Sequence, residues 1–309
     1  MIRFYYFLTL AMIALFTALP LGCAKSGATV DPGAHRKEIL DWQKTRLKNL
    51  TKDDGWLTLC GLFWLKEGEN TFGSDTANAI VFPPGKTPAR AGSIWLEHGA
   101  LRMEARPGAQ IRHGDSAVAS MVLTSDGEGA SDPTILDIGT IRFYVIKRGE
   151  QLGVRVKDKE NPARVNFKGL EYFPIDPRWR FEARFEPYKP PKILEIATMI
   201  GTTEKDSSPG ALVFDLDGKT YRIDPVIEAG NENQFFIMFG DETNGKETYN
   251  NGRQLYTSLP DSTGRVILDF NRAYNWPCVF TKFATCPIPP RQNRLPVRVE
   301  AGEKMYAGH

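Results

Sequence analysis

Side chains that could orient a ligand gather in the C-terminal segment from Gly240 to Glu303. Polar, aromatic and proline residues crowd together there, and the alternation typical of a strand is weak after Phe270. Pockets that orient small molecules use a few polar or charged side chains beside aromatic rings. We therefore expect a site for a small polar or sugar-like ligand, built from five residues: Arg253, Asp269, Asn271, Tyr274 and Asn275. A scaffold role stays open, because such side chains also satisfy the backbone of irregular segments.

The expected geometry follows from the strand that ends near Phe270. Asp269 and Asn271 share a parity and face one side of that strand, whereas Leu268 and Phe270 face the other. If the core lies under the apolar pair, the polar pair points into solvent or a cleft. Arg253 is the nearby cation whose planar fork suits a carboxylate, either that of Asp269 or one on a ligand.

A carboxylate-dependent hydrolase or lyase is the alternative function. Its available acids and bases are Asp269, Glu247 and Glu303. Such an enzyme needs one acid whose surroundings raise its pKa, and a glycosidase-like pair would lie roughly 5–10 Å apart. Hydrolysis by a Ser–His pair is disfavoured, because no Gly-x-Ser-x-Gly elbow occurs and the four histidines are scattered. No zinc-site spacing or nucleotide-binding glycine loop appears, so we expect no metal and no cofactor.

The C-terminal cysteines Cys278 and Cys286 are separated by seven residues. In an oxidising compartment a disulfide between them is the default expectation, while two separate thiols, or a metal or catalytic role, stay open. Closing so short a loop stabilises a fold by only about 2.5 kcal/mol on the chain-entropy model. A bridge would therefore mainly hold the shape of the loop. Cys60 lies in an apolar run and is expected to be a buried small hydrophobe.

The N-terminus has the pattern of an export signal. Arg3 precedes an apolar stretch from Phe4 to Ala18. This stretch is shorter than the ~20 residues that a membrane-spanning helix needs, and small residues follow it. Residues 1–22 are therefore predicted to be a cleaved signal peptide.

The end of this signal resembles the lipobox of bacterial lipoproteins, because a glycine directly precedes Cys23. Pro20 is a departure from that motif. The resemblance implies a lipid on Cys23 and a short tether over residues 23–32. Because no aspartate follows the cysteine, it also implies an anchor in the outer membrane, facing the periplasm. Ordinary signal cleavage just after Cys23 stays the alternative.

Charge gives no support to a nucleic-acid partner. Lysine and arginine number 39 against 37 aspartates and glutamates, a net charge of +2, and no run of like charges occurs. Binding to a phosphate backbone draws on clustered cations. We therefore expect two partners, a membrane reached through the lipid and a small polar ligand, and no nucleic acid.

One helix is predicted behind the tether. Asp31-Pro32 suits a helix N-cap followed by proline in the first turn. Four apolar residues then fall on one side of a helix: Ile39, Trp42, Leu47 and Leu50.

The remaining chain is predicted to be mainly β. Roughly ten to twelve runs alternate apolar and polar residues, with turn signals between them and no sustained helix–strand alternation. The strongest hairpin joins Leu212–Leu216 to Lys219–Ile223 through Asp217-Gly218. These patterns favour an antiparallel β-sandwich or barrel with one N-terminal α-helix. We expect residues 33–309 to form a single domain, in which the proline-rich residues 174–191 are either a seam between subdomains or a surface connection.

Several strings resemble a widespread bacterial family that is catalogued only as a domain of unknown function, whose members are often described as lipoproteins. They are Gly61–Leu65, Phe167–Pro174, Leu268–Asn275, Ala284–Pro287 and Asn293–Leu295. Trp276 departs from the expected pattern. The resemblance covers about Glu38 to Lys304 and implies one family-wide unit in an exported setting. It implies no activity and no catalytic residue.

Overall fold

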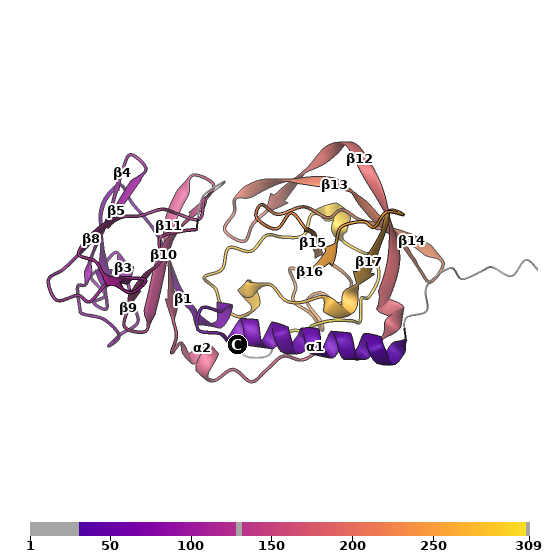
Figure 1. Cartoon of the computed structure of the whole chain (residues 1–309), viewed down its shortest axis with the longest axis horizontal. Coiled ribbons are helices and arrows are strands. Elements are labelled where there is room, and N and C mark those ends of the chain that lie inside the picture. Colours follow the sequence, from indigo (N-terminus) through magenta and orange to yellow (C-terminus); the bar gives the residue numbers. More distant parts are fainter. Residues whose placement is uncertain (1–30, 128–131, 307–309) are drawn as a thin grey trace, which may run out of the picture.

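The computed structural model describes residues 31–127 and 132–306. The signal peptide, Cys23 and His309 lie outside these residues. Within them, the chain forms two β lobes with a long helix, α1 (Pro32–Thr51), along one flank of the second lobe (Figure 1). The prediction of a mainly antiparallel β fold with one N-terminal helix is confirmed.

The first lobe consists of two sheets that share one core. Its strands are β1 (Leu59–Trp64), β2 (Gly68–Gly73), β3 (Ile80–Val81), β4 (Gly92–Glu97), β5 (Ala100–Ala105), β6 (Arg112–His113), β7 (Ser116–Ala117), β8 (Ser120–Val122), β9 (Leu136–Ile138), β10 (Ile141–Arg148) and β11 (Gln151–Asp158). The orders are β1-β11-β10-β9-β6-β7 and β3-β2-β4-β5-β8. Among the named strands, only β2 and β3 pair in parallel. Inward residues of both sheets form the core, in which the rings of Phe72, Phe82 and Phe143 lie 5.2–5.5 Å apart.

The second lobe is built on a four-stranded sheet, β14-β13-β12-β17, and a two-stranded ladder, β15-β16. Its elements are α2 (Pro162–Val165), η2 (Pro177–Trp179), β12 (Arg180–Ala197), β13 (Thr203–Leu216), β14 (Lys219–Ile223), β15 (Gln234–Phe239), β16 (Arg253–Ser258), β17 (Arg265–Asp269), η3 (Phe270–Arg272), η4 (Pro277–Val279) and η5 (Arg291–Asn293). The predicted hairpin is β13–β14, and its turn residues Asp217 and Gly218 have φ angles of 50° and 75°. Because such angles strain most residues, aspartate and glycine suit this turn.

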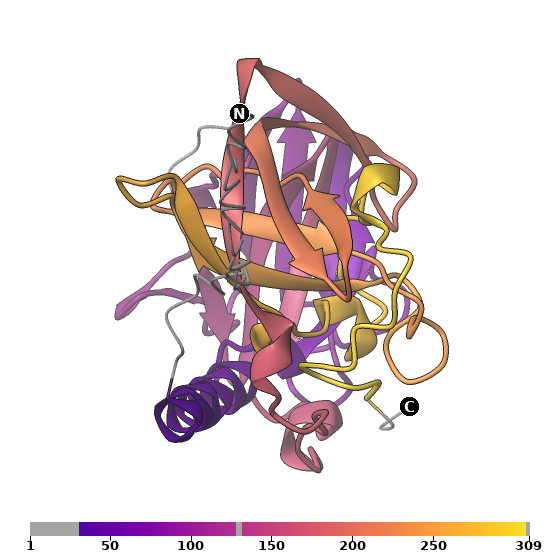
Figure 2. The same ribbon diagram turned by 90° about the vertical axis from the view of Figure 1, so that its right-hand side faces the viewer.

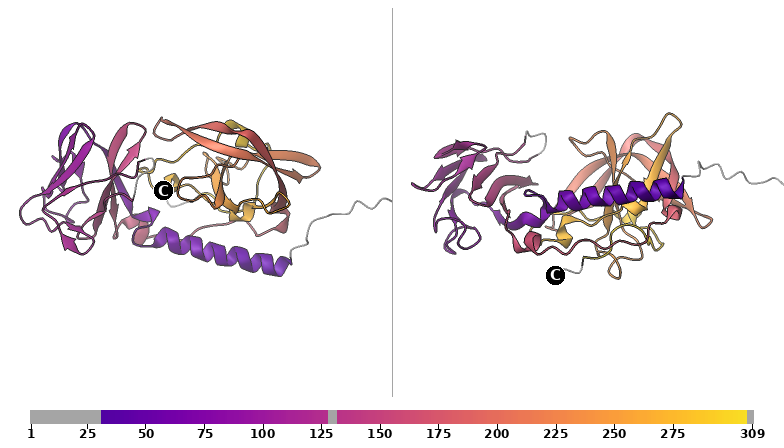
Figure 3. Two further views of the ribbon diagram at one scale, coloured as in Figure 1. Left: turned by 45° about the horizontal axis from the view of Figure 1, so that its top comes forward. Right: turned by 60° about the horizontal axis from the view of Figure 1, so that its bottom comes forward.

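Helix α1 begins as predicted, since the Asp31 side chain accepts hydrogen bonds from the backbone of Gly33 and Ala34. Figure 2 shows the helix end-on against the flank of the second lobe, and both views of Figure 3 keep it alongside that lobe. Its buried residues are His35, Ile39 and Leu50. Leu47, predicted on the same side of the helix as Ile39 and Leu50, is 40% exposed.

The lobes meet through an apolar cluster. Leu59 of β1 packs with Leu194 and Ile196 of β12 and with Met238 of β15, and a short 3-10 turn, η1 (Trp56–Thr58), connects α1 to β1. Residues 174–191, the expected seam, contain η2 and the start of β12, and Trp179 packs in the core of the second lobe. The division of the chain into domains stays a prediction.

Within residues 31–127 and 132–306, no helix has the length and apolar character needed to cross a membrane.

Candidate functional site

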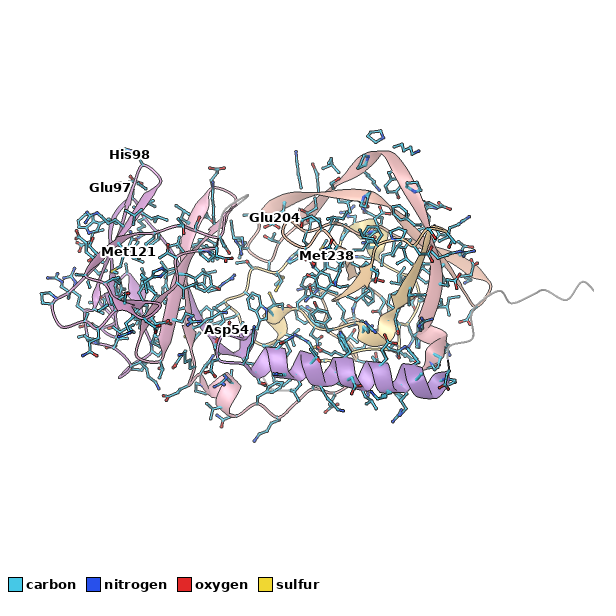
Figure 4. All side chains as sticks on the ribbon, in the orientation of Figure 1. Asp54, Glu97, His98, Met121, Glu204 and Met238 are labelled. Carbon is cyan, nitrogen blue, oxygen red and sulfur yellow. The ribbon has the colours of Figure 1, made fainter. Side chains whose placement is uncertain are left out.

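A cleft lies between α1 and the β15–β16 ladder, and we call it the α1 cleft. Its main compartment has a volume of about 370 Å³. The helix side consists of Trp42, Thr45, Arg46 and Asn49, and the facing side consists of Gln234, Tyr256, Thr257, Ser258, Arg272 and Tyr274. A side compartment of about 220 Å³ shares Tyr256, Thr257, Ser258 and Arg272 and adds Glu38, Arg180, Ile267 and Asp269. Figure 4 shows side chains filling the space between α1 and the strands above it.

The four cleft residues of the helix lie on one face. Trp42 is three or four positions from Thr45 and Arg46, and these two are four and three positions from Asn49. Residues at this spacing lie on one face of an α-helix. His35, Ile39 and Leu50 bury the same flank and hold the helix against the second lobe. The cleft is therefore a partly polar part of the contact between α1 and the second lobe, which is otherwise mainly apolar.

Arg46 is held rigidly at the wall of the cleft. Its Nε donates to Glu303 Oε1 at 2.8 Å and its Nη2 donates to the carbonyl of Asn275 at 3.3 Å. The side chain of Arg46 is 12% exposed and that of Glu303 is fully buried. Burial opposes the charge on Arg46, but the Glu303 carboxylate outweighs it and leaves the pKa of Arg46 raised. The guanidinium is thus charged and already oriented.

Aromatic rings line the same wall. The guanidinium carbon of Arg46 lies 4.6 Å from the centroid of the Tyr274 ring. The centroids of the Trp42 and Tyr274 rings are 6.0 Å apart, and the angle between the ring planes is 53°. Burial raises the pKa of Tyr274; Arg46 opposes this rise and Glu303 adds to it. The phenol therefore stays protonated and can donate a hydrogen bond. Flat apolar faces with polar tips are suited to ligands that carry both CH and OH groups.

Tyr256 borders both compartments. Its hydroxyl donates to Glu228, and its ring stacks on Phe236 with centroids 4.8 Å apart. Burial and the hydrogen bond to Glu228 raise the pKa of Tyr256. Burial also raises the pKa of Glu228, and Asp206 adds to this shift. Tyr256 is therefore oriented from behind by a carboxyl group.

The side compartment contains balanced charge. Arg272 Nη2 pairs with Glu38, while the buried Nε of Arg272 has no hydrogen-bond partner among the described residues. Arg180 stands directly opposite Asp269 in the β12–β17 ladder. Arg272 is therefore paired with a carboxylate.

The five residues expected to form one surface are not brought together. Tyr274 lines the main compartment and Asp269 the side compartment, but Arg253, Asn271 and Asn275 line neither. All three of these are buried.

Arg253 serves the scaffold. Its Nη2 donates to Asp241 Oδ2 at 2.9 Å and to the carbonyl of Val299 at 2.8 Å, and its Nη1 donates to the carbonyl of Ala301. The expectation that its fork meets Asp269 is therefore wrong. The guanidinium is fully buried. Its two terminal nitrogens bind Asp241 and backbone carbonyls of the C-terminal segment, while its Nε has no hydrogen-bond partner among the described residues.

Asp269 and Asn271 are covered by α1. His35 Nε2 donates to Asp269 Oδ2 at 2.7 Å. Asp269 Oδ1 accepts from the backbone and side-chain nitrogens of Asn271 at 3.0 and 2.8 Å, and Asn271 Nδ2 also donates to the carbonyl of Asp176. The expected open face opposite Leu268 and Phe270 is thus closed by the helix, except where Asp269 meets the side compartment.

Asn275 also holds the C-terminal segment. Its backbone nitrogen donates to Glu303 Oε2 at 2.9 Å, and its Nδ2 donates to the carbonyl of Lys304 at 2.7 Å. Together with the Arg46–Glu303 pair, these bonds join α1 to residues 275 and 303–304.

The three carboxylates of the alternative enzyme have separate partners. Glu247 pairs with Arg298 at 2.6 Å, which lowers the pKa of Glu247. Glu303 pairs with Arg46, and Asp269 with His35. Only Asp269 borders the cleft. A lowered pKa at Glu247 is the opposite of what a general acid needs.

All three cysteines of the described residues are thiols. The backbone nitrogen of Cys278 donates to Cys286 Sγ at 3.2 Å. A hydrogen bond between the two thiols lowers the pKa of Cys278 and raises that of Cys286. The side chains therefore lie close together, and the disulfide stays a prediction. Cys60 is partly buried, and burial raises the pKa of its thiol to about 12, which disfavours the thiolate at neutral pH.

Sequence reasoning missed the helix side of the cleft and five of the six residues that face it in the main compartment: Gln234, Tyr256, Thr257, Ser258 and Arg272. The sequence did contain a signal for Arg46 on the helix side, because Arg46 shares a helix face with Ile39, Trp42 and Leu50. A cation on the apolar face of a helix needs a partner when that face is buried. The identity of that partner, Glu303, could not be read from local sequence.

Comparisons with known proteins give a family without an activity. A family model described as “Protein of unknown function (DUF1684)” matches residues 165–304. No curated protein matches the chain. Among solved structures, the solution NMR structure of an uncharacterized protein from Haloarcula marismortui is 34% identical, with a TM-score of 0.39. The match covers 47% of this chain and 81% of that one.

Proposed function

We propose, for a chain that belongs to the family described as “Protein of unknown function (DUF1684)”, a role in binding a small, sugar-like polar ligand in the α1 cleft. One observation carries the proposal. The cleft combines the rings of Trp42 and Tyr274 with the fixed guanidinium of Arg46 and a rim of hydroxyl and amide groups.

The preorganised wall favours binding. Arg46 and Tyr256 are both oriented by carboxyl groups behind them, so a ligand would order few side chains. Ordering rotamer-rich side chains is one of the main costs of association. Because Arg46 and Arg272 each have a carboxylate partner, the cleft requires no charge on the ligand. This balance favours a neutral, hydroxyl-rich molecule over a strong anion.

The test is titration of the purified full chain with a panel of neutral mono- and disaccharides, followed by tryptophan fluorescence and calorimetry. At least one sugar should bind saturably. Ser258→Ala and Gln234→Ala should weaken it roughly 5–10-fold, the loss of one hydrogen bond. Trp42→Ala should weaken it further.

Matched controls separate the cleft from the rest of the surface. Ser207→Ala changes an exposed serine of β13, and Trp64→Ala changes an exposed tryptophan of the first lobe. Both should bind as the parent does. Absence of saturable binding across the panel, or cleft variants that bind as tightly as the controls, would overturn the proposal. Hydrolysed or eliminated sugar that depends on Asp269 would instead favour the carboxylate enzyme.

We also propose that the protein is exported and held in the outer membrane by a lipid on Cys23, facing the periplasm. The apolar N-terminal stretch and the glycine before Cys23 support this. Native protein should partition with membranes, and Cys23→Ala should release it or block processing. Mass spectrometry that finds an unmodified mature N-terminus beyond Cys23 would contradict the anchor.

An oxidising compartment also favours the Cys278–Cys286 bridge. Thiol labelling of denatured, non-reduced protein from the envelope should then modify Cys60 alone. Labelling of all three cysteines would exclude the bridge.

A further inference from the structure

A second polar cluster lies in the first lobe, away from the α1 cleft. Arg155 and Lys157 project from the same side of β11, with Tyr144 of β10 directly opposite Arg155. The guanidinium carbon of Arg155 lies 5.2 Å from the ring of Trp56 and 5.9 Å from that of Tyr144. The Lys157 Nζ lies 5.7 and 5.8 Å from the same two rings. Two cations thus share two aromatic rings.

Arg155 is buried without a carboxylate. It is 5% exposed, and its one hydrogen bond among the described residues runs from Nη1 to the Tyr144 hydroxyl at a long 3.4 Å. Its Nε has no hydrogen-bond partner within that part of the chain, and it makes no ion pair there. Ring contacts stabilise a cation less than the burial of one ion costs. The guanidinium therefore needs an anion that these residues do not supply.

The neighbouring charges do not fill this role. Arg142 is held by Asp137 at 2.8 Å. Lys52 pairs with Asp54 at 3.4 Å, and Lys157 Nζ donates to the backbone carbonyl of Asp54 at 2.6 Å. Asp54 lies where the end of α1 meets the first lobe (Figure 4). Arg155 and Lys157 are thus the two cations left without a carboxylate contact.

We propose that Arg155 and Lys157, walled by Trp56 and Tyr144, bind a phosphate-type oxyanion. Two neighbouring cations, neither in an ion pair among the described residues, match a dianion. The guanidinium supplies paired N–H donors and the ammonium supplies a point charge. Trp56, Tyr144 and Lys157 are only partly buried, so the ligand reaches the cations from the surface. The source is either free phosphate or the phosphate monoester of a small molecule.

The ionisation of Lys157 is consistent with a missing anion. Burial lowers the pKa of Lys157, Arg155, Arg142 and Lys52 add to this shift, and Asp54 opposes it, so that the pKa falls to about 8. A bound dianion would stabilise the ammonium and raise this pKa toward its ordinary value. This shift reports occupancy directly and is independent of stability.

The experiment is calorimetric titration of the full chain with inorganic phosphate and, separately, glycerol 3-phosphate, in a low-salt buffer without other oxyanions. NMR of lysines labelled at Cε follows the pKa of Lys157. Saturable binding of either probe is expected, with a rise of at least one unit in that pKa. Tighter binding of the ester identifies a monoester, and equal binding identifies free phosphate.

Variants locate the site. Lys157→Met, which keeps the apolar stem, should weaken binding at least 10-fold, as should Arg155→Gln. Lys147→Met, which changes an exposed lysine of β10, should leave it unchanged. If neither probe binds at 10 mM, or if Lys157→Met binds as tightly as Lys147→Met, the proposal is wrong.

Discussion

Two arginines of this protein, Arg46 and Arg155, have little exposure to solvent and opposite surroundings. Arg46, at the α1 cleft, has a carboxylate at 2.8 Å, whereas Arg155, in the first lobe, has two rings and one long hydrogen bond. A cation–ring contact is worth about 0.5–2 kcal/mol, whereas burying an ion costs several kcal/mol. Because Arg46 is paired with Glu303, its guanidinium is stable without a ligand and is already oriented toward the cleft. Lack of pairing makes Arg155 a site that a ligand would complete.

The largest expected effect comes from removing the charge of Arg46. In Arg46→Met the fully buried carboxylate of Glu303 loses its cation, and such a loss costs about 3–5 kcal/mol. Urea denaturation would measure the decrease in the free energy of unfolding. Arg36→Met, on the exposed side of the same helix, is the control and should change it by less than about 0.5 kcal/mol. A loss below about 1 kcal/mol at Arg46 would mean that Glu303 is satisfied without it.

An intermediate effect is expected from pH at Lys157. Its folded pKa, about 8, lies below the ordinary 10.5, so the unfolded chain binds more protons between these two values. Stability should therefore rise as pH increases from about 8 to 10.5. Because the ammonium is partly exposed, we expect a rise of only about 1–2 kcal/mol.

The control for this rise is Lys157→Met, which should not show it. Thermal or urea unfolding at several pH values, in buffers without oxyanions, gives the difference between the two proteins. Adding phosphate should flatten the rise in the parent protein. Parallel pH profiles for parent and variant would contradict the lowered pKa.

The smallest expected effect comes from Arg155→Met. No carboxylate among the described residues is left unpaired when this charge is removed, and replacement of a buried charge by an apolar side chain is often neutral or stabilising. We expect a change within about 1 kcal/mol of the parent. A loss comparable to that of Arg46→Met would show that the Trp56 and Tyr144 contacts satisfy Arg155, and would remove the difference between the two sites.

The fold was predictable where its signals are local. The Asp217-Gly218 turn and the alternation of its flanking strands predicted β13–β14, and Asp31-Pro32 predicted the start of α1. The site was predictable only in part. Tyr274 and Asp269 border the α1 cleft, whereas Arg253 and Asn275 are bound to the C-terminal backbone. Polar residues in an irregular segment can either bind a ligand or satisfy the protein's own backbone groups, and the composition of the segment does not distinguish these two roles.

Local patterns in the amino-acid sequence predict many of the strands, the β13–β14 turn and the start of α1, because each depends on residues a few positions apart. Which charges meet depends on how distant segments pack. Arg46 pairs with Glu303 across 257 positions and His35 with Asp269 across 234. Such pairs form when α1 docks on the second lobe, and the same docking covers Asp269 at the end of β17 and shapes the cleft. Arg155 shows the converse, since its burial between two rings, without an ion pair to any carboxylate of residues 31–127 and 132–306, follows from the packing around it and from no pattern near it in the chain.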